Sequence, residues 1–359
     1  MAAARRSALC WCLLVVALWF GREAAEGGDV AGIYELKRGP FSAKLTNFGA
    51  TLLSVMVPDR NGKVDDIVLG FETIDEYKND TTYFGALIGR VGNRIAGAQF
   101  TLKGVRYSLK PNDGNNSLHG GPKGFSEVVW KVRSYRPDSH VSFTYHSQDG
   151  EEGFPGDLDV CVTYMLIETN KLAIKMEAKA LNKATPVNLI SHAYWNLAGH
   201  DSGDILGHNL QVFGSKITPL NRELIPTGEI VGVEGTAYDF RRPCLVGSRI
   251  NELPDGYNIN YVLENTSGGQ HLTKAAVVQE SKSGRRMELW TDQPGVQLYT
   301  SNGMGGVKGK GGAVYNNHAG LCLETQGFPD AVNQPNFPSV IVNPGETYRH
   351  VMVHRFTAK

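Results

Sequence analysis

The sequence contains few cysteines, and none of them follows a metal-binding spacing. Cys10 and Cys12 lie near the N-terminus, which leaves Cys161, Cys244 and Cys322 for the rest of the chain. Three is an odd number, so at most one disulfide can form and at least one thiol stays free. Cys161 and Cys322 alternate with apolar neighbours, and we expect both to be small core residues. The cysteines therefore predict no metal site.

An excess of charge of either sign is also missing. The 359 residues include 36 Lys and Arg and 36 Asp and Glu, which gives a formal net charge of +0. A neutral balance gives no reason to expect nucleic acid or an anionic membrane surface as a partner. Hydrophobic residues make up 41% of the chain and charged residues 20%, and both fractions are ordinary for a globular protein.

The apolar run near the N-terminus is too short to span a membrane. It covers residues 9–20, follows Arg5 and Arg6, and precedes several small residues. A spanning helix needs about 20 apolar residues, whereas basic residues, a short apolar run and a small-residue region are typical of a secretory signal peptide. We therefore predict a signal peptide at 1–25, with cleavage within 21–27.

This leader has consequences for the rest of the chain. We expect a secreted protein with no membrane partner once the peptide is removed, and a single domain over 28–359. Three asparagines fit the N-glycosylation sequon, which is a usable pattern in a secreted protein: Asn79, Asn115 and Asn265. The sequence makes no prediction about the oligomeric state.

Long stretches of helical periodicity are absent, and apolar residues instead recur at every second position. The longest series is Leu172, Ile174, Met176, Ala178 and Ala180. Such alternation is typical of a strand with one buried face, and it returns at 141–145, 160–166, 287–291 and 296–300. The 42 glycines and the turn pairs at 61–62, 103–104, 149–150 and 283–284 predict tight connections between strands. The fold class predicted is all-β, a large antiparallel β-sandwich.

Two ionisable residues lie in unusually apolar surroundings. His192 lies in the aromatic and apolar segment 191–199, and Glu324 is the one carboxylate in 321–326. A buried ionisable group is costly unless it has a partner or a task. A histidine and a carboxylate that meet in the fold could work as a general acid–base pair.

Six blocks in a fixed order resemble the aldose 1-epimerase (galactose mutarotase) family. They are residues 89–96, 116–121, 186–189, 225–228, 293–297 and 322–326. The resemblance implies a mutarotase-like supersandwich and a cofactor-independent enzyme that interconverts the α and β anomers of a monosaccharide substrate, a free aldose.

The resemblance also implies roles for individual residues. Glu324 is the expected base and His192 the expected acid. Asn93, Arg94, His119 and Gln297 match positions that contact the sugar. An Arg94 side chain beside Glu324 would keep that carboxylate ionised. Two aromatic residues are candidates for stacking on the sugar ring, although core packing is expected for at least one of them: Tyr194 and Trp195.

One substrate-binding position departs from the family pattern. Asn258 stands where an aspartate is expected, and a neutral acceptor forms weaker hydrogen bonds than a charged one. This departure predicts weaker or altered sugar binding, and it leaves open a carbohydrate-binding protein with little turnover.

A third alternative is a hexose-6-phosphate 1-epimerase of the same superfamily, which would need a basic cluster for the phosphate. Lys308 and Lys310 could contribute, but the glycine-rich segment 303–312 predicts a mobile surface loop with both lysines exposed to solvent. The presence of both Glu324 and His192 favours the mutarotase.

Overall fold

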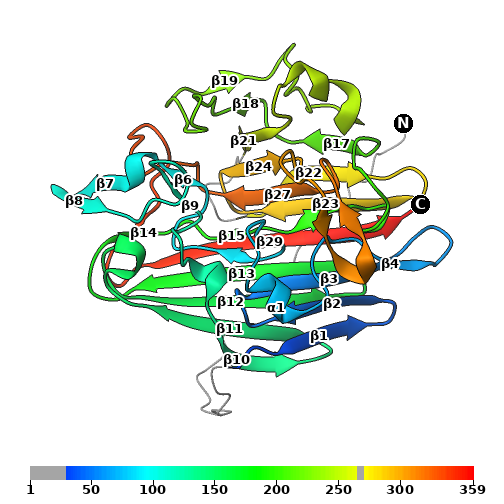
Figure 1. The fold of residues 1–359 in the computed structure, drawn as a ribbon, viewed down its shortest axis with the longest axis horizontal. Helices are drawn as coiled ribbons and strands as arrows, with labels where there is room; N and C mark the ends of the chain where they lie inside the picture. Colours follow the sequence, from blue (N-terminus) through cyan, green and yellow to red (C-terminus); the bar gives the residue numbers. More distant parts are fainter. Residues whose placement is uncertain (1–29, 265–270) are drawn as a thin grey trace, which may run out of the picture.

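The computed structural model describes residues 30–264 and 271–359. The predicted signal peptide and Asn265 lie outside these ranges. Among the described residues no helix is long and apolar enough to cross a membrane. Residues 30–264 and 271–359 contain one α-helix, the single turn α1 (Ile74–Tyr77), and nearly all their other regular structure is strand, so the predicted all-β class is confirmed (Figure 1).

The largest sheet has nine antiparallel strands and runs across the molecule (Figure 1). Its central strand is the C-terminal β29 (Thr347–Ala358), between β13 (Lys171–Ala180) and β23 (Arg285–Thr291). The others, in order from each edge to the centre, are β10 (Lys131–Arg136), β11 (His140–Ser147) and β12 (Leu158–Ile167) on one side, and β20 (Cys244–Leu245), β17 (Asn209–Val212) and β22 (Thr273–Gln279) on the other.

Two smaller sheets supply the opposing layer of the sandwich. One contains β1 (Ile33–Arg38), β2 (Phe41–Thr46), β3 (Thr51–Pro58) and β4 (Val64–Asp66). The other contains, in spatial order, β16 (Tyr194–Trp195), β27 (Leu321–Gln326), β24 (Gly295–Tyr299), β21 (Asn258–Val262), β18 (Lys216–Ile217) and β19 (Val231–Gly232).

Five two-stranded pairs complete the described strands. They are β5 (Leu87–Ile88) with β15 (Ile190–Ser191), β6 (Arg94–Ile95) with β9 (Ser117–Leu118), β7 (Gln99–Leu102) with β8 (Val105–Ser108), β14 (Thr185–Pro186) with β28 (Ile341–Val342), and β25 (Val307–Lys308) with β26 (Val314–Tyr315). Short 3-10 helices lie at 96–98, 125–127, 151–153, 246–248, 250–252 and 310–312.

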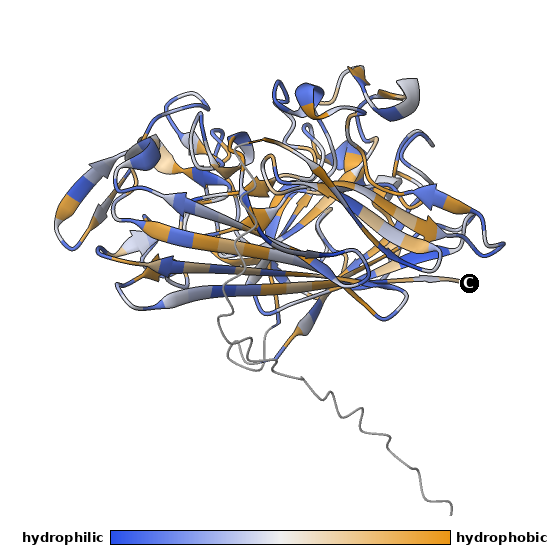
Figure 2. Cartoon of the chain, turned by 90° about the horizontal axis from the view of Figure 1, so that it is seen from below, coloured by the Kyte–Doolittle hydropathy of each residue, from blue (hydrophilic) through white to orange (hydrophobic). Residues whose placement is uncertain are grey.

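The core lies between these layers. One cluster of buried apolar side chains includes residues of all three large sheets, among them Val162 of β12, Val55 of β3 and Leu323 of β27. Figure 2 shows hydrophobic residues alternating with hydrophilic ones along the long strands. The alternation from Leu172 to Ala180 faces this core as predicted, with all five residues buried.

One of the two cysteines predicted to lie in the core does not. Cys161 is only half-buried, because it alternates with the core-facing Val160 and Val162 and so belongs to the outer face of β12. Cys322 is buried as expected, and all three described cysteines are free thiols.

The segment 303–312 contains strand β25 and a 3-10 helix, so it is not the predicted mobile loop. Lys308 is exposed, but the ammonium group of Lys310 lies inside the protein. It donates to Asp66 Oδ2 (2.6 Å) and to the carbonyls of Leu53 (2.9 Å) and Val68 (2.7 Å). The segment is therefore attached to the β3–β4 region of the fold.

Candidate active site

Three neighbouring strands, β27, β24 and β21, carry polar side chains on one face. We call this face the floor of the site. Along β27, the alternation places Leu321, Leu323 and Thr325 on one face and Cys322, Glu324 and Gln326 on the other. Thr325 bonds His350 of β29 (Oγ1 to Nε2, 2.7 Å), so its face is the one that packs on the nine-stranded sheet. Glu324 therefore belongs to the face turned away from that sheet.

The same face continues onto the two adjacent strands. Glu324 lies directly opposite Gln297 of β24, Gln297 lies opposite Asn260 of β21, and Asn258 is two residues before Asn260. Opposite residues in antiparallel strands share a face of the sheet. The register thus gathers Asn258, Gln297 and Glu324, although 66 positions of sequence separate the first from the last.

A chain of side-chain amides crosses this floor. Gln326 Nε2 donates to Gln297 Oε1 (3.2 Å) and to Asn260 Oδ1 (3.1 Å), and Gln297 Nε2 donates to Asn258 Oδ1 (2.7 Å). Because each amide is bonded to the next, the orientation of Gln297 depends on Gln326 as well as on Asn258.

His192 reaches Glu324 from the connection between β15 and β16. The backbone of His192 donates to Ala86 O (3.0 Å) and accepts from Gly85 N (3.0 Å), and β16 pairs with β27. His192 Nε2 lies 3.7 Å from Glu324 Oε1. The ring of Tyr194 stacks on the His192 imidazole, with centroids 5.1 Å apart.

Burial controls the protonation of this pair. Desolvation raises the pKa of Glu324 to about 8 and lowers the pKa of His192 to about 4, because burial disfavours the charged form of each group. Between these two values the pair holds one dissociable proton. Glu324 Oε2 is buried and has no hydrogen-bond partner within the described part of the chain, so a hydroxyl donor at that oxygen would stabilise the carboxylate.

The β6–β9 pair supplies a second histidine. His119 N donates to Asn93 O (3.0 Å), and Asn93 N donates to His119 Nδ1 (3.2 Å). Burial lowers the pKa of His119 well below its ordinary value, so the ring is neutral and carries its proton on Nε2. The ring lies 5.2 Å from His192, edge to face.

Asn93 and His119 also share an unusual backbone conformation. Asn93 and His119 have φ values of 60° and 52°, in the left-handed region that few residues other than glycine adopt. Such conformations cluster at functional sites, where the surrounding structure compensates the strain. The reciprocal hydrogen bonds between Asn93 and His119 supply that compensation here.

Arg94 pairs with Asp113 and not with Glu324. Its Nε donates to Asp113 Oδ2 (2.6 Å), and neither the hydrogen bonds nor the ion pairs of the described residues join it to Glu324. The Arg94–Glu324 pair, which the sequence left open, is not formed, because Arg94 Nε bonds Asp113 in the β6–β9 connection. No cation of the described residues offsets the burial of Glu324, and burial raises its carboxyl pKa.

The structure links most of the predicted site residues by direct contacts: Glu324 with His192, His192 with His119, His119 with Asn93, and Gln297 with Asn258. Trp195 instead packs in the core against His354 and Phe356, as predicted for one of the two aromatics. Sequence reasoning missed Tyr83, whose ring lies 4.8 Å from His119, and it missed Asp113 and Gln326. The position of Gln326, two residues after Glu324 on one strand, was the available signal.

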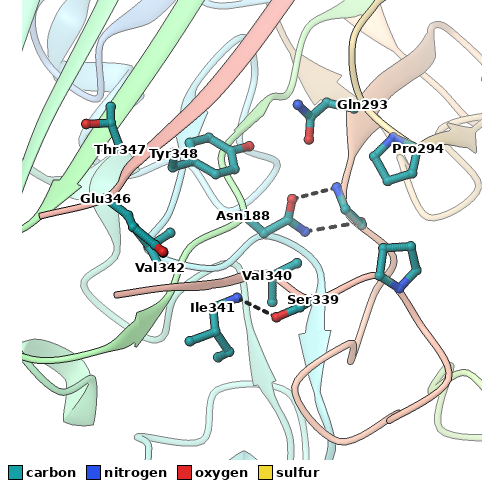
Figure 3. Close-up of a pocket in the computed structure, with 12 residues that line it drawn as sticks. Asn188, Gln293, Pro294, Ser339, Val340, Ile341, Val342, Glu346, Thr347 and Tyr348 are labelled. Atoms are coloured by element: carbon teal, nitrogen blue, oxygen red, sulfur yellow. Dashed lines mark hydrogen bonds between the residues drawn. The ribbon is translucent and has the colours of Figure 1, made fainter. Parts of the chain in front are cut away.

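A separate cavity of about 500 Å³ contains none of the predicted residues (Figure 3). It lies where β27 ends, between Gln293, Val340 and Tyr348. Asn188 on its wall accepts from Gly327 N (2.8 Å) and donates to Gly327 O (3.2 Å). These two bonds hold the end of the strand that carries Glu324.

Comparison with known proteins agrees with this geometry. The sequence profile of the aldose 1-epimerase family matches residues 32–355. The chain belongs to this family. Similar relatives include galactose mutarotase from Bos taurus, 44% identical over 92% of this chain and 95% of that protein, and galactose mutarotase from Homo sapiens, 42% identical over 93% and 96%. Aldose 1-epimerase from Escherichia coli is 34% identical over 88% and 92%.

Solved structures of aldose 1-epimerase relatives have the same fold. An aldose epimerase homologue from C. elegans superposes with a TM-score of 0.86 at 33% identity, covering 92% of this chain and 99% of that one. Galactose 1-epimerase from Lactobacillus acidophilus gives a TM-score of 0.76 at 24% identity over 91% and 98%, which demonstrates the common fold. The predicted mutarotase-like sandwich is confirmed.

Proposed function

We propose that this aldose 1-epimerase interconverts the α and β anomers of free aldohexoses such as galactose and glucose, with Glu324 as base and His192 as acid. The contact that carries the proposal is the 3.7 Å approach of His192 Nε2 to Glu324 Oε1. Both side chains are buried, so the pair is shielded from solvent, and a general base and a general acid are the two groups that the reaction requires.

Ring opening and closure use the same two proton transfers in opposite directions. Glu324 takes the proton of the anomeric hydroxyl while His192 gives one to the ring oxygen, and the C1–O5 bond breaks. The open aldehyde then turns about its C1–C2 bond. On closure His192 takes back the proton of the C5 hydroxyl, Glu324 returns its proton to the former aldehyde oxygen, and the other anomer forms.

The burial of the pair suits this exchange. The state with a carboxylate and an imidazolium and the state with a carboxyl and a neutral imidazole contain the same number of protons. Burial favours the second state in the free protein. Sugar hydroxyls that donate to Glu324 would favour the first state, so the two states become closer in energy when substrate binds.

The remaining residues would hold the sugar. His119 presents an Nε2 donor, and Arg94 presents a guanidinium suited to hydroxyl oxygens. Gln297 and Asn258 present amides from the floor of the site. We assign these residues to substrate binding.

Exchange NMR of the galactose anomers tests the catalytic assignment. Glu324→Gln keeps the shape but removes the base, and we expect kcat to fall by about 10²–10⁴-fold. His192→Asn should cause a loss of similar size. Cys244→Ala, a half-buried residue of β20, serves as a matched control with an unchanged rate. An unchanged rate in Glu324→Gln would remove the assigned base.

The two alternatives make different predictions in the same experiment. A carbohydrate-binding protein with little turnover would bind galactose without exchange above the spontaneous rate. A hexose-6-phosphate 1-epimerase would prefer the phosphorylated sugar. Lys310 is committed to Asp66 and two carbonyls, so it adds nothing to a phosphate site, and free aldoses are the better substrates on this ground.

We also propose that the protein follows the secretory route. The basic, apolar and small-residue sequence of the first 25 residues supports this proposal. Asn79 and Asn115 are exposed, as acceptor asparagines for N-linked glycans must be.

A further inference from the structure

Three potential metal ligands meet at the proposed catalytic pair. His192, Cys322 and Glu324 each offer one ligand atom, and these atoms lie within 4.8 Å of one another. Cys322 and Glu324 share one face of β27, and the pairing of β16 with β27 brings His192 to them. The sequence analysis paired His192 with Glu324 but not with Cys322, which is 130 positions away.

The nitrogen and sulfur atoms have a spacing close to that of two ligands of one metal. Cys322 Sγ lies 3.7 Å from His192 Nδ1. Zinc bond lengths of about 2.3 Å to sulfur and about 2.0 Å to nitrogen, at a tetrahedral angle, place the two ligand atoms about 3.5 Å apart. The Glu324 carboxylate must turn to join them, because its Oε1 contacts the other ring nitrogen, Nε2 (3.7 Å).

The carboxylate of Glu324 can turn to become the third metal ligand. None of the residues that the structure describes forms a hydrogen bond with the buried Glu324 Oε2, so turning the carboxylate toward the thiol breaks no bond to them at that oxygen. A thiolate and a carboxylate together neutralise a divalent cation, which lowers the cost of burying all three charges. A thiolate with an imidazole selects zinc-like cations over magnesium or calcium.

We propose that His192, Cys322 and Glu324 bind a soft divalent cation of the zinc class, and that this cation inhibits the enzyme. On binding, the Cys322 thiol and the carboxyl of Glu324 release their protons to solvent, and the metal occupies both members of the acid–base pair. Cation binding is independent of the function proposed above, whereas the inhibition rests on it.

Cobalt(II) provides a spectroscopic test that needs no sugar. The full-length protein titrated with Co²⁺ should develop a saturable thiolate-to-cobalt absorption band, which equimolar Zn²⁺ abolishes by displacement. Cys322→Ala should lose the band and bind Zn²⁺ at least tenfold more weakly in competition with a chromophoric chelator. Cys244→Ala, which removes a different thiol, should retain both properties. An identical band in Cys322→Ala, or no saturable band in the wild type, would overturn the proposal.

Mutarotation assays separate the two proposals. Zn²⁺ should inhibit the wild type, with relief by chelator and by excess galactose, and should inhibit Cys322→Ala at least tenfold less, each relative to its own metal-free rate. Metal binding without any mutarotation would contradict the proposed function alone. Mutarotation that Zn²⁺ does not inhibit would contradict the inhibitory site alone.

Discussion

Burial and the partner of Arg94 together set the pKa of the Glu324 carboxyl group. A lone carboxylate in an apolar strand indicates a buried group with a task, and the structure confirms that Glu324 is buried. The pKa of the Glu324 carboxyl also depends on whether a cation such as Arg94 lies next to it. Arg94 bonds Asp113, 19 positions along the chain, and no local pattern distinguishes that partner from Glu324.

The pH dependence of the rate follows from this pair. It holds one proton between the pKa of His192, about 4, and the pKa of Glu324, about 8. The proton is lost as pH rises through the upper value, and a second proton blocks the base as pH falls through the lower value. We expect a bell-shaped profile of kcat/KM with limbs near these values. A rate that still rises above pH 9 would contradict the assignment.

The substitution Asn258→Asp restores the aspartate that the family pattern has at this position. Asn258 Oδ1 accepts from Gln297, so Asn258→Asp keeps that bond and offers a charged oxygen to the sugar. We expect KM for galactose to fall about fivefold, because a charged acceptor adds about 1 kcal/mol. The new negative charge should also raise the pKa of Glu324 and move the alkaline limb upward.

Steady-state polarimetry with galactose and glucose measures the KM change, and the pH profile of the same variant measures the movement of the limb. Equal KM values and equal limbs in wild type and Asn258→Asp would remove Asn258 as a determinant of binding.

At the scale of elements, strands were predictable and the glycine-rich segment was not. Alternation is a local property, so 160–166 and 287–291 can be identified as strands without knowledge of their neighbours. The segment 303–312 is ordered by Lys310, whose carboxylate partner Asp66 is 244 positions away. Composition alone cannot reveal a contact of that kind.

Lys310→Met tests whether this lysine fixes the segment. The variant leaves the Asp66 carboxylate, which is 14% exposed, without its cation, and two carbonyls lose a donor. We expect the free energy of unfolding to fall by about 3 kcal/mol, measured by chemical denaturation. Lys308→Met, at an exposed lysine two residues earlier, is the matched control and should change stability by less than about 0.5 kcal/mol. Equal stability of the two variants would contradict the prediction.

At the scale of the whole molecule, the proposed secretory route can be tested on the glycans. Expressed with its leader in a mammalian secretory line, the protein should appear in the medium and lose mass on treatment with an N-glycosidase. Asn79→Gln and Asn115→Gln should each remove one step of that mass change. Intracellular retention of an unglycosylated chain that keeps residues 1–25 would contradict both the leader and the glycosylation.

The central place of β29 has a consequence for how the chain is made. The last regular element of the sequence fills the middle of the largest sheet, and its His350 supports the strand that carries Glu324. Until residues 347–358 have left the ribosome, β13 and β23 each expose an edge that β29 later pairs. The largest sheet therefore cannot be completed during synthesis of the strands that precede β29, and a stop codon before Thr347 would leave an aggregation-prone product with no competent active site.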